Sequence, residues 1–155
     1  MEIEAVEVKS QPILFISRTC AMDPPKIAEA MGSAFHALGE FIGKNGIEPA
    51  GPPIAIYREW DEQNITFDVG LPVGAGALEQ ESGEVKAGET PSGRALKSVH
   101  KGPYAKLPES YAEFEGYVKD SGMPQPTLTW EIYLNDSDTV PEAELLTELY
   151  MALPD

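Results

Sequence analysis

The side chains in this sequence that are best suited to chemistry are acids and tyrosines that alternate with apolar residues. Glu131 and Tyr133 stand two positions apart in one apolar stretch, and Glu148 and Tyr150 stand two apart in another. If both stretches are strands, each pair projects from a single face, because side chains alternate along a strand. An aromatic face attracts a cation by about 0.5–2 kcal/mol, and a partly desolvated carboxylate adds a counter-charge. These pairs therefore predict a site for a flat, lipophilic cation.

Three residues of the first half extend this candidate site. Tyr57 and Asp68 occupy the corresponding places in the stretches 54–60 and 64–73. Trp60, at the end of the first stretch, could cover a bound ligand or be an exposed cap, and both interpretations stay open. So does the ordinary interpretation of the whole set, because antiparallel sheets often leave one face in water, where Glu and Tyr are common.

The residue composition gives little support for a metal site, a disulfide or a serine hydrolase. The chain has two histidines, His36 and His100, and one cysteine, Cys20, so a transition-metal site and an internal disulfide are not expected. No serine lies in a Gly-x-Ser-x-Gly context, and nothing predicts a cofactor. We expect His100 to be structural, satisfied by a hydrogen bond to the backbone or to a helix terminus.

Composition narrows the classes of partner. The 155 residues include 11 Lys+Arg and 26 Asp+Glu, a formal charge of −15, which argues against binding nucleic acid or an anionic membrane surface. With 42% hydrophobic and 24% charged residues, the chain is expected to fold. It has no apolar run of about 20 residues for a membrane span and no signal peptide. We therefore expect a cytoplasmic protein.

The sequence pattern repeats at an offset of about 80 residues. The apolar helical stripe at positions 27, 31, 34 and 38 returns at 107, 111, 114 and 118, and Asp68 corresponds to Glu148. Gly46 and Gly122 are expected to end the two helices. This predicts one domain, 1–155, built from repeat one (about 1–73), a Gly-rich linker (74–83) and repeat two (about 84–155).

Each repeat is predicted to hold an extended segment, a helix and two strands. The fold class is therefore α+β: two β-α-β-β repeats related by a pseudo-twofold axis, with an antiparallel sheet, the helices on one face and a ligand groove on the other. Alternation predicts that Ile54, Ile56, Trp130, Ile132 and Leu134 face the helices. The opposite face is predicted to gather Tyr57, Asp68, Glu131, Tyr133, Glu148 and Tyr150.

Three segments, 98–104, 130–136 and 148–151, resemble the GyrI-like small-molecule-binding domain, the effector-binding domain of drug-sensing transcription regulators. The resemblance implies two β-α-β-β repeats and a site for hydrophobic, often cationic compounds between them. It also implies multidrug-type recognition, with Glu131 as the counter-charge and with Glu148 and Tyr150 lining the pocket.

The resemblance leaves two functions open. Regulators of the family carry a helix-turn-helix domain ahead of the ligand domain, whereas this chain begins with its first strand, so we expect a free-standing binder that does not contact DNA. Some free-standing members are cofactor-free hydrolases of cyclopropane-containing drugs that use a Tyr and a Glu. Here that would make Glu131 the base, and Tyr57 or Tyr133 would polarise or protonate the electrophile. Binding without turnover is the favoured interpretation, and any protein partner stays undefined.

Overall fold

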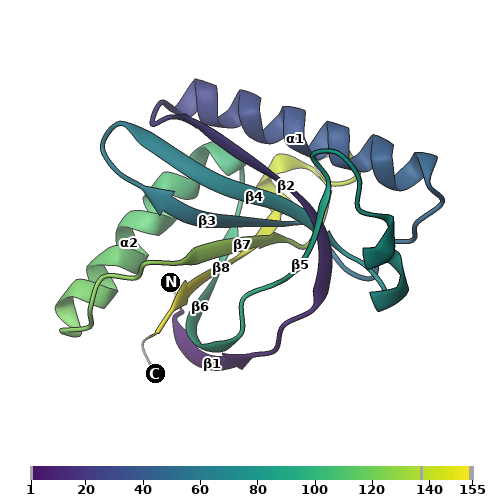
Figure 1. Cartoon of the computed structure of the whole chain (residues 1–155). Coiled ribbons are helices and arrows are strands. Elements are labelled where there is room, and N and C mark those ends of the chain that lie inside the picture. Colours follow the sequence, from purple (N-terminus) through teal and green to yellow (C-terminus); the bar gives the residue numbers. More distant parts are fainter. Residues whose placement is uncertain (1, 137, 154–155) are drawn as a thin grey trace. The chain divides into compact units, whose positions relative to one another are not determined.

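The structure, a computed structural model, describes residues 2–136 and 138–153 and has an α+β architecture. The chain divides into two compact units: unit 1 is Met1–Val8 with Ser92–Asp155, and unit 2 is Lys9–Pro91. The elements follow in this order (Figure 1): β1 (Glu4–Val8), β2 (Pro12–Ala21), α1 (Pro24–Lys44), β3 (Ile54–Trp60), β4 (Asn64–Pro72), η1 (Ala75–Gln80), β5 (Lys86–Glu89), β6 (Gly93–Lys101), η2 (Tyr104–Lys106), α2 (Leu107–Asp120), β7 (Thr129–Tyr133), η3 (Glu142–Glu144) and β8 (Leu146–Ala152).

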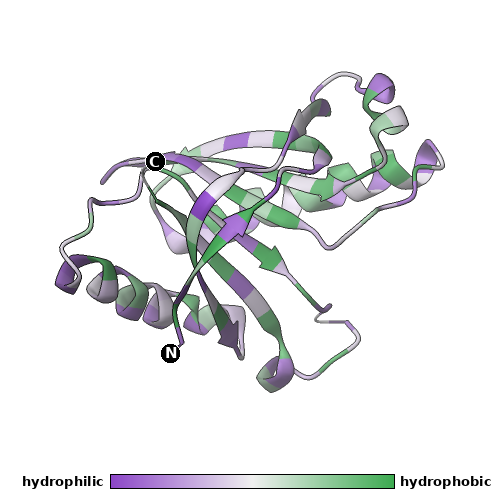
Figure 2. Cartoon of the chain, turned by 90° about the horizontal axis from the view of Figure 1, so that it is seen from below, coloured by the Kyte–Doolittle hydropathy of each residue, from purple (hydrophilic) through white to green (hydrophobic). Residues whose placement is uncertain are grey.

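Both long helices end at the predicted glycines. Gly46 and Gly122 adopt φ angles of 65° and 72°, which suit a residue without a side chain. After each glycine the next backbone N–H returns to a carbonyl of the last helical turn: Ile47 donates to Ile42, and Met123 to Val118. Figure 2 shows hydrophobic and hydrophilic residues alternating along both helices, as expected for helices that cover one face of a sheet.

Unit 2 holds a four-stranded antiparallel sheet in the order β5-β2-β4-β3. Strands β3 and β4 form an antiparallel hairpin. Its turn is held by the Asp61 carboxylate, which accepts the backbone N–H groups of Gln63 and Asn64 at 2.8 and 2.7 Å. These two hydrogen bonds hold the pKa of Asp61 below its ordinary value.

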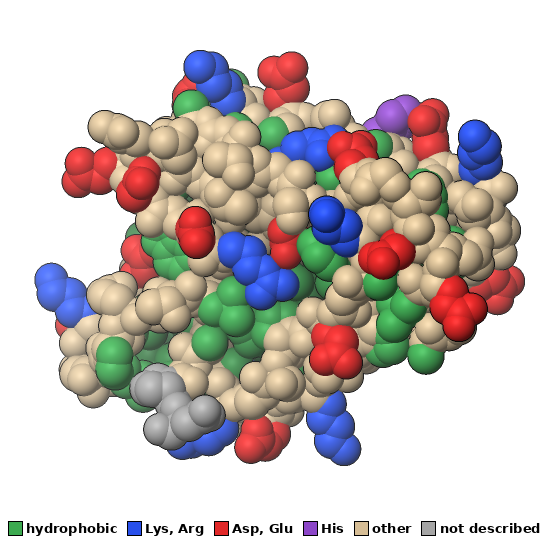
Figure 3. All heavy atoms as spheres, viewed as in Figure 1, with side chains coloured by type: hydrophobic (Ala, Val, Ile, Leu, Met, Phe, Trp, Pro, Cys, Tyr) green, Lys and Arg blue, Asp and Glu red, His purple; other side chains and the backbone are tan. Residues whose placement is uncertain are grey.

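On the surface viewed in Figure 3, charged side chains of both signs lie among uncharged ones.

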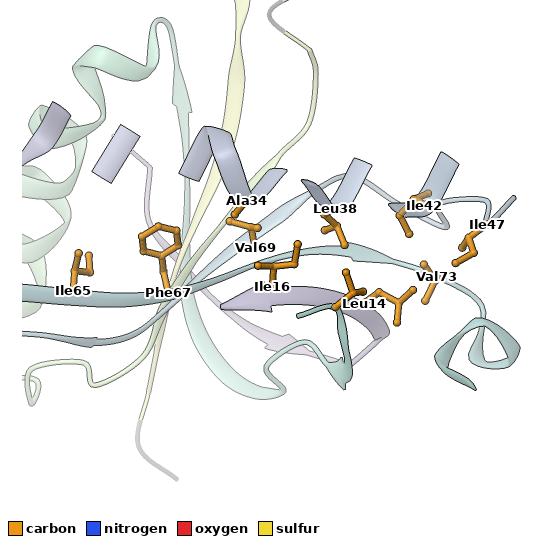
Figure 4. Close-up of a cluster of buried hydrophobic side chains, with 11 residues drawn as sticks. Leu14, Ile16, Ala34, Leu38, Ile42, Ile47, Ile65, Phe67, Val69 and Val73 are labelled. Carbon is orange, nitrogen blue, oxygen red and sulfur yellow. The ribbon is translucent and has the colours of Figure 1, made fainter. Parts of the chain in front are cut away.

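The core of unit 2 lies between α1 and one face of this sheet. In Figure 4 the side chains of Leu38 and Ile42 point from α1 toward the strands, where Leu14 and Ile16 of β2 lie beneath them. Phe67 and Val69 of β4 complete the same layer and are fully buried. Complete burial of such side chains contributes about 1.5–3 kcal/mol each. Because Phe67 and Val69 face α1, the alternation along β4 places Asp68 on the opposite face.

Unit 1 contributes four antiparallel strands, in the order β1-β6-β8-β7. Helix α2 packs on one face of these strands through a core to which the helix and two strands contribute. The buried members are Leu96, Phe114, Val118, Leu149 and Met151, with Leu107, Tyr111 and Leu153 packed around them. The predicted helix of the second repeat and the two strands after it are present.

The compact units divide the chain differently from the two predicted repeats. Strand β1, at the start of the chain, pairs with β6, so it belongs to unit 1. Strand β5 follows the predicted linker and pairs with β2, so it belongs to unit 2. The linker itself contains a short 3₁₀ helix, η1. Strand β1, from predicted repeat one, therefore belongs to the unit that holds most of repeat two. Strand β5, from predicted repeat two, belongs to the unit that holds most of repeat one.

The predicted face assignment is right for β4 and β8 but wrong for β3 and β7. On β7, Glu131 lies opposite Leu149 on the α2 side, while Trp130 lies opposite Tyr150 on the other side. On β3, Tyr57 packs with the α1 core, which turns Ile54 and Ile56 away from that helix. Hydropathy could not reveal this on β7, because Trp130 and Glu131 are both only 2% exposed.

Candidate functional site

The strongest candidate site is built around Glu131, on β7 beneath α2 in unit 1. Its carboxylate is buried and accepts two tyrosine hydroxyls, one at each oxygen. Tyr111 of α2 donates to Oε1 at 3.0 Å, and Tyr133 of β7 donates to Oε2 at 3.0 Å. Burying a carboxylate is costly unless hydrogen bonds replace its water. The two phenols supply such bonds and surround the acid with aromatic rings.

A row of polar side chains crosses the sheet next to Glu131. Tyr133 lies opposite Thr147 of β8, and Thr147 lies opposite His100 of β6. The Thr147 side chain is fully buried, and its hydroxyl has no hydrogen-bond partner among the described residues. An unpaired buried hydroxyl costs about 1–3 kcal/mol, so a water or ligand atom beside Thr147 would be stabilised.

Tyr104 extends the aromatic surroundings of Glu131. Its ring meets the ring of Tyr133 edge-on, with the centroids 5.7 Å apart and the planes at 72°. Burial, followed by the negative charges of Asp136 and Glu131, raises the pKa of the Tyr104 hydroxyl above its ordinary value. The tyrosines that surround Glu131 therefore come from η2, α2 and β7.

His100 is held structurally, as the sequence predicts. Its Nε2 lies 3.0 Å from the Pro103 carbonyl, which can only accept, so the ring donates there. Its Nδ1 lies 2.6 Å from the Ser110 hydroxyl of α2. Both contacts border a shallow depression of about 390 Å³ between the end of β6 and the start of α2. The histidine thereby ties the first turn of α2 to the sheet beside Glu131.

Glu148 and Tyr150 lie on the opposite face of the same sheet, away from α2. The Tyr150 hydroxyl donates to Glu148 at 3.1 Å, and the Lys97 ammonium lies 3.0 Å from the other carboxylate oxygen. The Tyr150 ring stacks on Trp130, with centroids 5.1 Å apart and planes 4° from parallel. Burial, followed by the charge of Glu148, raises the pKa of Tyr150 above its ordinary value.

In unit 2 the predicted residues also separate by face. Asp68 is buried on the face away from α1, where it accepts the Ser17 hydroxyl and the Arg58 Nε, the latter at 2.9 Å. Tyr57 lies on the α1 face, and its ring centroid is 6.2 Å from that of Phe67. Trp60 is 42% exposed at the end of β3.

The structure therefore brings the predicted site residues together in pairs. Glu131 lies with Tyr133, Glu148 lies with Tyr150, and each pair occupies its own face of the unit 1 sheet. The prediction of one face holding all six acids and tyrosines is wrong, because the alternation on β3 and β7 is displaced by one residue. The groove between the two repeats stays a prediction.

Sequence reasoning missed several residues that complete these clusters. Tyr111 was placed in the apolar stripe of the second helix, and its position there is right. The available signal was its hydroxyl, since a buried tyrosine usually finds a polar partner. Lys97 and Arg58 gave no signal, because alternation cannot show which carboxylate a long basic side chain will reach.

Two further structural observations bear on cofactors and membranes. Across residues 2–136 and 138–153, no three or more His, Cys, Asp or Glu side chains gather as metal ligands would. Over the same residues, neither long helix combines the length and apolarity needed to cross a bilayer.

Comparison with known proteins places this architecture in a family. The family described as the GyrI-like small-molecule-binding domain matches residues 1–154. The chain belongs to this family. As a GyrI-like domain, it is a small-molecule-binding domain. No curated protein matches the chain at the level of sequence.

Solved structures share the GyrI-like fold at low sequence identity. The C-terminal domain of EcmrR is 17% identical with a TM-score of 0.83, and the alignment covers 99% of this chain and 98% of that one. In the complex of EcmrR with DNA, this chain spans 56% of the EcmrR chain. SAV2435 bound to tetraphenylphosphonium is 10% identical, with a TM-score of 0.69 and coverage of 99% and 94%. A hydrolase from Listeria innocua is 16% identical, with a TM-score of 0.63 and coverage of 99% and 92%.

Proposed function

We propose that this GyrI-like domain is a cytoplasmic binder of lipophilic, cationic aromatic small molecules and that Glu131 is the counter-charge for the ligand. The observation that carries the proposal is the buried Glu131 carboxylate between the hydroxyls of Tyr111 and Tyr133. A buried carboxylate among aromatic rings suits a cation with a delocalised charge and an apolar surface. The aromatic faces add cation–π attraction, which strengthens as water is removed.

The burial of Glu131 also sets what a ligand must do to reach it. Tyr111 belongs to α2 and covers one carboxylate oxygen, so a ligand that contacts this oxygen has to displace that hydroxyl. The hydroxyl of Thr147, fully buried in the neighbouring row, offers the ligand or a retained water a hydrogen bond. A lipophilic cation that replaces the Tyr111 hydroxyl would neutralise this buried charge, and a retained water could satisfy Thr147.

The test is a calorimetric titration of wild type and of Glu131→Gln with tetraphenylphosphonium. The substitution keeps the shape of the side chain and removes its charge. We expect it to weaken binding about 10- to 100-fold, the range for losing a charged hydrogen-bonding partner. Glu115→Gln, on an exposed part of α2, makes the same change in net charge and should leave affinity unchanged. Absence of binding at about 100 μM, or equal affinity in Glu131→Gln, would overturn the proposal.

A second candidate function, hydrolysis of an electrophilic cyclopropane-type compound without a cofactor, is favoured by one contact. The Tyr133 hydroxyl lies 3.0 Å from the Glu131 carboxylate, within the reach needed for proton transfer. Glu131 would remove a proton from water while the water oxygen bonds to a ring carbon. The ring bond to that carbon would break, Tyr133 would protonate the atom released, and Glu131 would return a proton to the Tyr133 oxygen. Product formation, followed by mass spectrometry and lost in Glu131→Gln with binding retained, would select this function over binding alone.

A further inference from the structure

Tyr150, on the face of the unit 1 sheet away from α2, has a different neighbour on each side. Strand β8 runs between β7 and β6, so Tyr150 lies opposite Trp130 on one strand and opposite Lys97 on the other. The indole of Trp130 stacks on its ring, and the Lys97 ammonium lies 5.9 Å from its centroid. The same ammonium lies 3.0 Å from the Glu148 carboxylate. The cluster of Lys97, Glu148, Tyr150 and Trp130 is therefore an aromatic and acidic site that holds a cation of the chain itself.

Lys97 can leave this position at low cost. The side chains of Lys97 and Glu148 are 26% and 17% exposed, so the ammonium can reach water. Lys97 lies directly opposite Glu4 of β1, an exposed acid that offers a second counter-charge. A released lysine also regains rotamer freedom. Lys97 is thus paired with Glu148 and has a second carboxylate on the neighbouring strand.

The corresponding acid of unit 2 is held more firmly. Asp68 accepts both Arg58 and Ser17, and its side chain is only 7% exposed. Arginine forms directional hydrogen bonds from a planar group, whereas lysine is a point charge on a flexible stem. Of these two basic side chains paired with sheet carboxylates, Lys97 is the one placed for exchange with a ligand.

We infer that Lys97 is a resident cation which competes with cationic ligands for Glu148 and the Tyr150 ring, and so sets the affinity and charge selectivity of this face. The inference rests on the proposed binding of lipophilic cations and goes beyond it, because Glu148 and Tyr150 lie on the sheet face opposite to Glu131. A small hydrated ammonium gains little by replacing Lys97, because it offers the same charge and no apolar surface. A delocalised aromatic cation that takes the place of the Lys97 ammonium over the Tyr150 ring brings apolar surface as well as charge.

The first test compares Lys97→Met with Lys26→Met by titration with tetraphenylphosphonium. Both variants lose one positive charge, and Lys26 is exposed on α1. We expect Lys97→Met to bind about three- to tenfold more tightly than wild type, because a partly exposed ion pair no longer competes. Lys26→Met should stay within about twofold of wild type. Equal affinity in the two variants would overturn the inference and leave the proposed function standing.

The second test measures the reactivity of Lys97 itself. Wild type is treated with an N-hydroxysuccinimide ester, with and without saturating tetraphenylphosphonium, and acylation at each lysine is followed by peptide mass spectrometry. Displacement predicts faster acylation of Lys97 in the presence of the cation and no change at Lys26. Unchanged or slower acylation of Lys97 would contradict displacement. If Lys97→Met binds and wild type does not, the resident cation is supported while the function proposed for the wild-type chain fails.

Discussion

Three carboxylates of the chain are largely withdrawn from water, and each is stabilised in its own way. Asp68 meets a guanidinium and a hydroxyl, Glu148 meets an ammonium and a phenol, and Glu131 accepts two phenols. Removing one member of such a group costs more than its hydrogen bond is worth, because a buried charge is left behind with fewer partners. The phenols are therefore part of the electrostatics of these sites, and their protonation affects stability.

Tyr150 makes this dependence measurable. Its pKa is raised in the folded protein, so the folded state keeps the phenol proton at a pH where the unfolded chain has lost it. The free energy of unfolding should thus be insensitive to this group below the ordinary tyrosine pKa of about 10 and should decline as the pH rises beyond it.

The measurement is urea unfolding of wild type and Tyr150→Phe from about pH 8 to about pH 11. At the lower end the variant should be less stable by about 1.5–3 kcal/mol, the range for a hydrogen bond to a charged group. Above about pH 10 its stability should fall less steeply than that of wild type. Parallel curves for the two proteins over the alkaline range would mean that Tyr150 does not carry the effect.

At the scale of helices and strands, the sequence predicted the elements well and their sidedness only in part. Both helices were predictable because each presents a continuous apolar stripe that is followed by a glycine. Strand β8 was also predictable, since Leu149 and Met151 alternate with more polar neighbours. The sidedness of β7 was not predictable, because the indole of Trp130 is as buried as the carboxylate of Glu131.

The same limit explains how much of the candidate site could be predicted. Glu131, Tyr133, Glu148 and Tyr150 were identifiable by residue type and spacing. Their division between two faces depends on strand register, which tertiary packing decides. The part of α2 in the site was hard to predict, because only the hydroxyl of Tyr111 distinguishes this residue from the other members of the apolar stripe.

Tyr111 connects α2 to Glu131, so its hydroxyl should stabilise the attachment of the helix. We expect Tyr111→Phe to lower the free energy of unfolding by about 1.5–3 kcal/mol, the range for hydrogen bonds to charged groups. Tyr117 lies on the same helix and is 41% exposed, so Tyr117→Phe should change stability by less than about 0.5 kcal/mol. Urea unfolding of both variants at neutral pH makes the comparison. Equal effects would show that the hydroxyl of Tyr111 does not hold the helix in place.

At the scale of the whole chain, the offset of 80 residues relates two acids with similar surroundings. Asp68 and Glu148 each lie on the sheet face away from their unit's helix, and each pairs with a basic side chain of the same sheet. The cations differ in type and come from different strands, Arg58 from β3 and Lys97 from β6. This parallel supports the predicted duplication at the level of charge placement, where few residue identities survive.

Charged side chains affect the stability of the whole chain in two opposing ways. The excess of 26 acidic over 11 basic residues produces self-repulsion that opposes the compact state. Ion pairs such as Arg18 with Glu84 and Lys97 with Glu148 act in the other direction. Partly exposed pairs of this kind contribute about 0.2–1 kcal/mol each, so a few of them do not offset repulsion among so many acids.

Salt should therefore stabilise the fold. As the ionic strength rises from about 0.01 M to about 0.15 M, the Debye length falls from about 30 Å to about 8 Å. Long-range repulsion is then screened, while pairs in contact at 3.0 Å lose less. We expect the urea midpoint to rise over this range, equally in sodium chloride and in choline chloride, because screening does not depend on the identity of the ion. A rise in only one of the salts would indicate specific ion binding. A fall in both would mean that the local ion pairs outweigh the repulsion of the acidic surface.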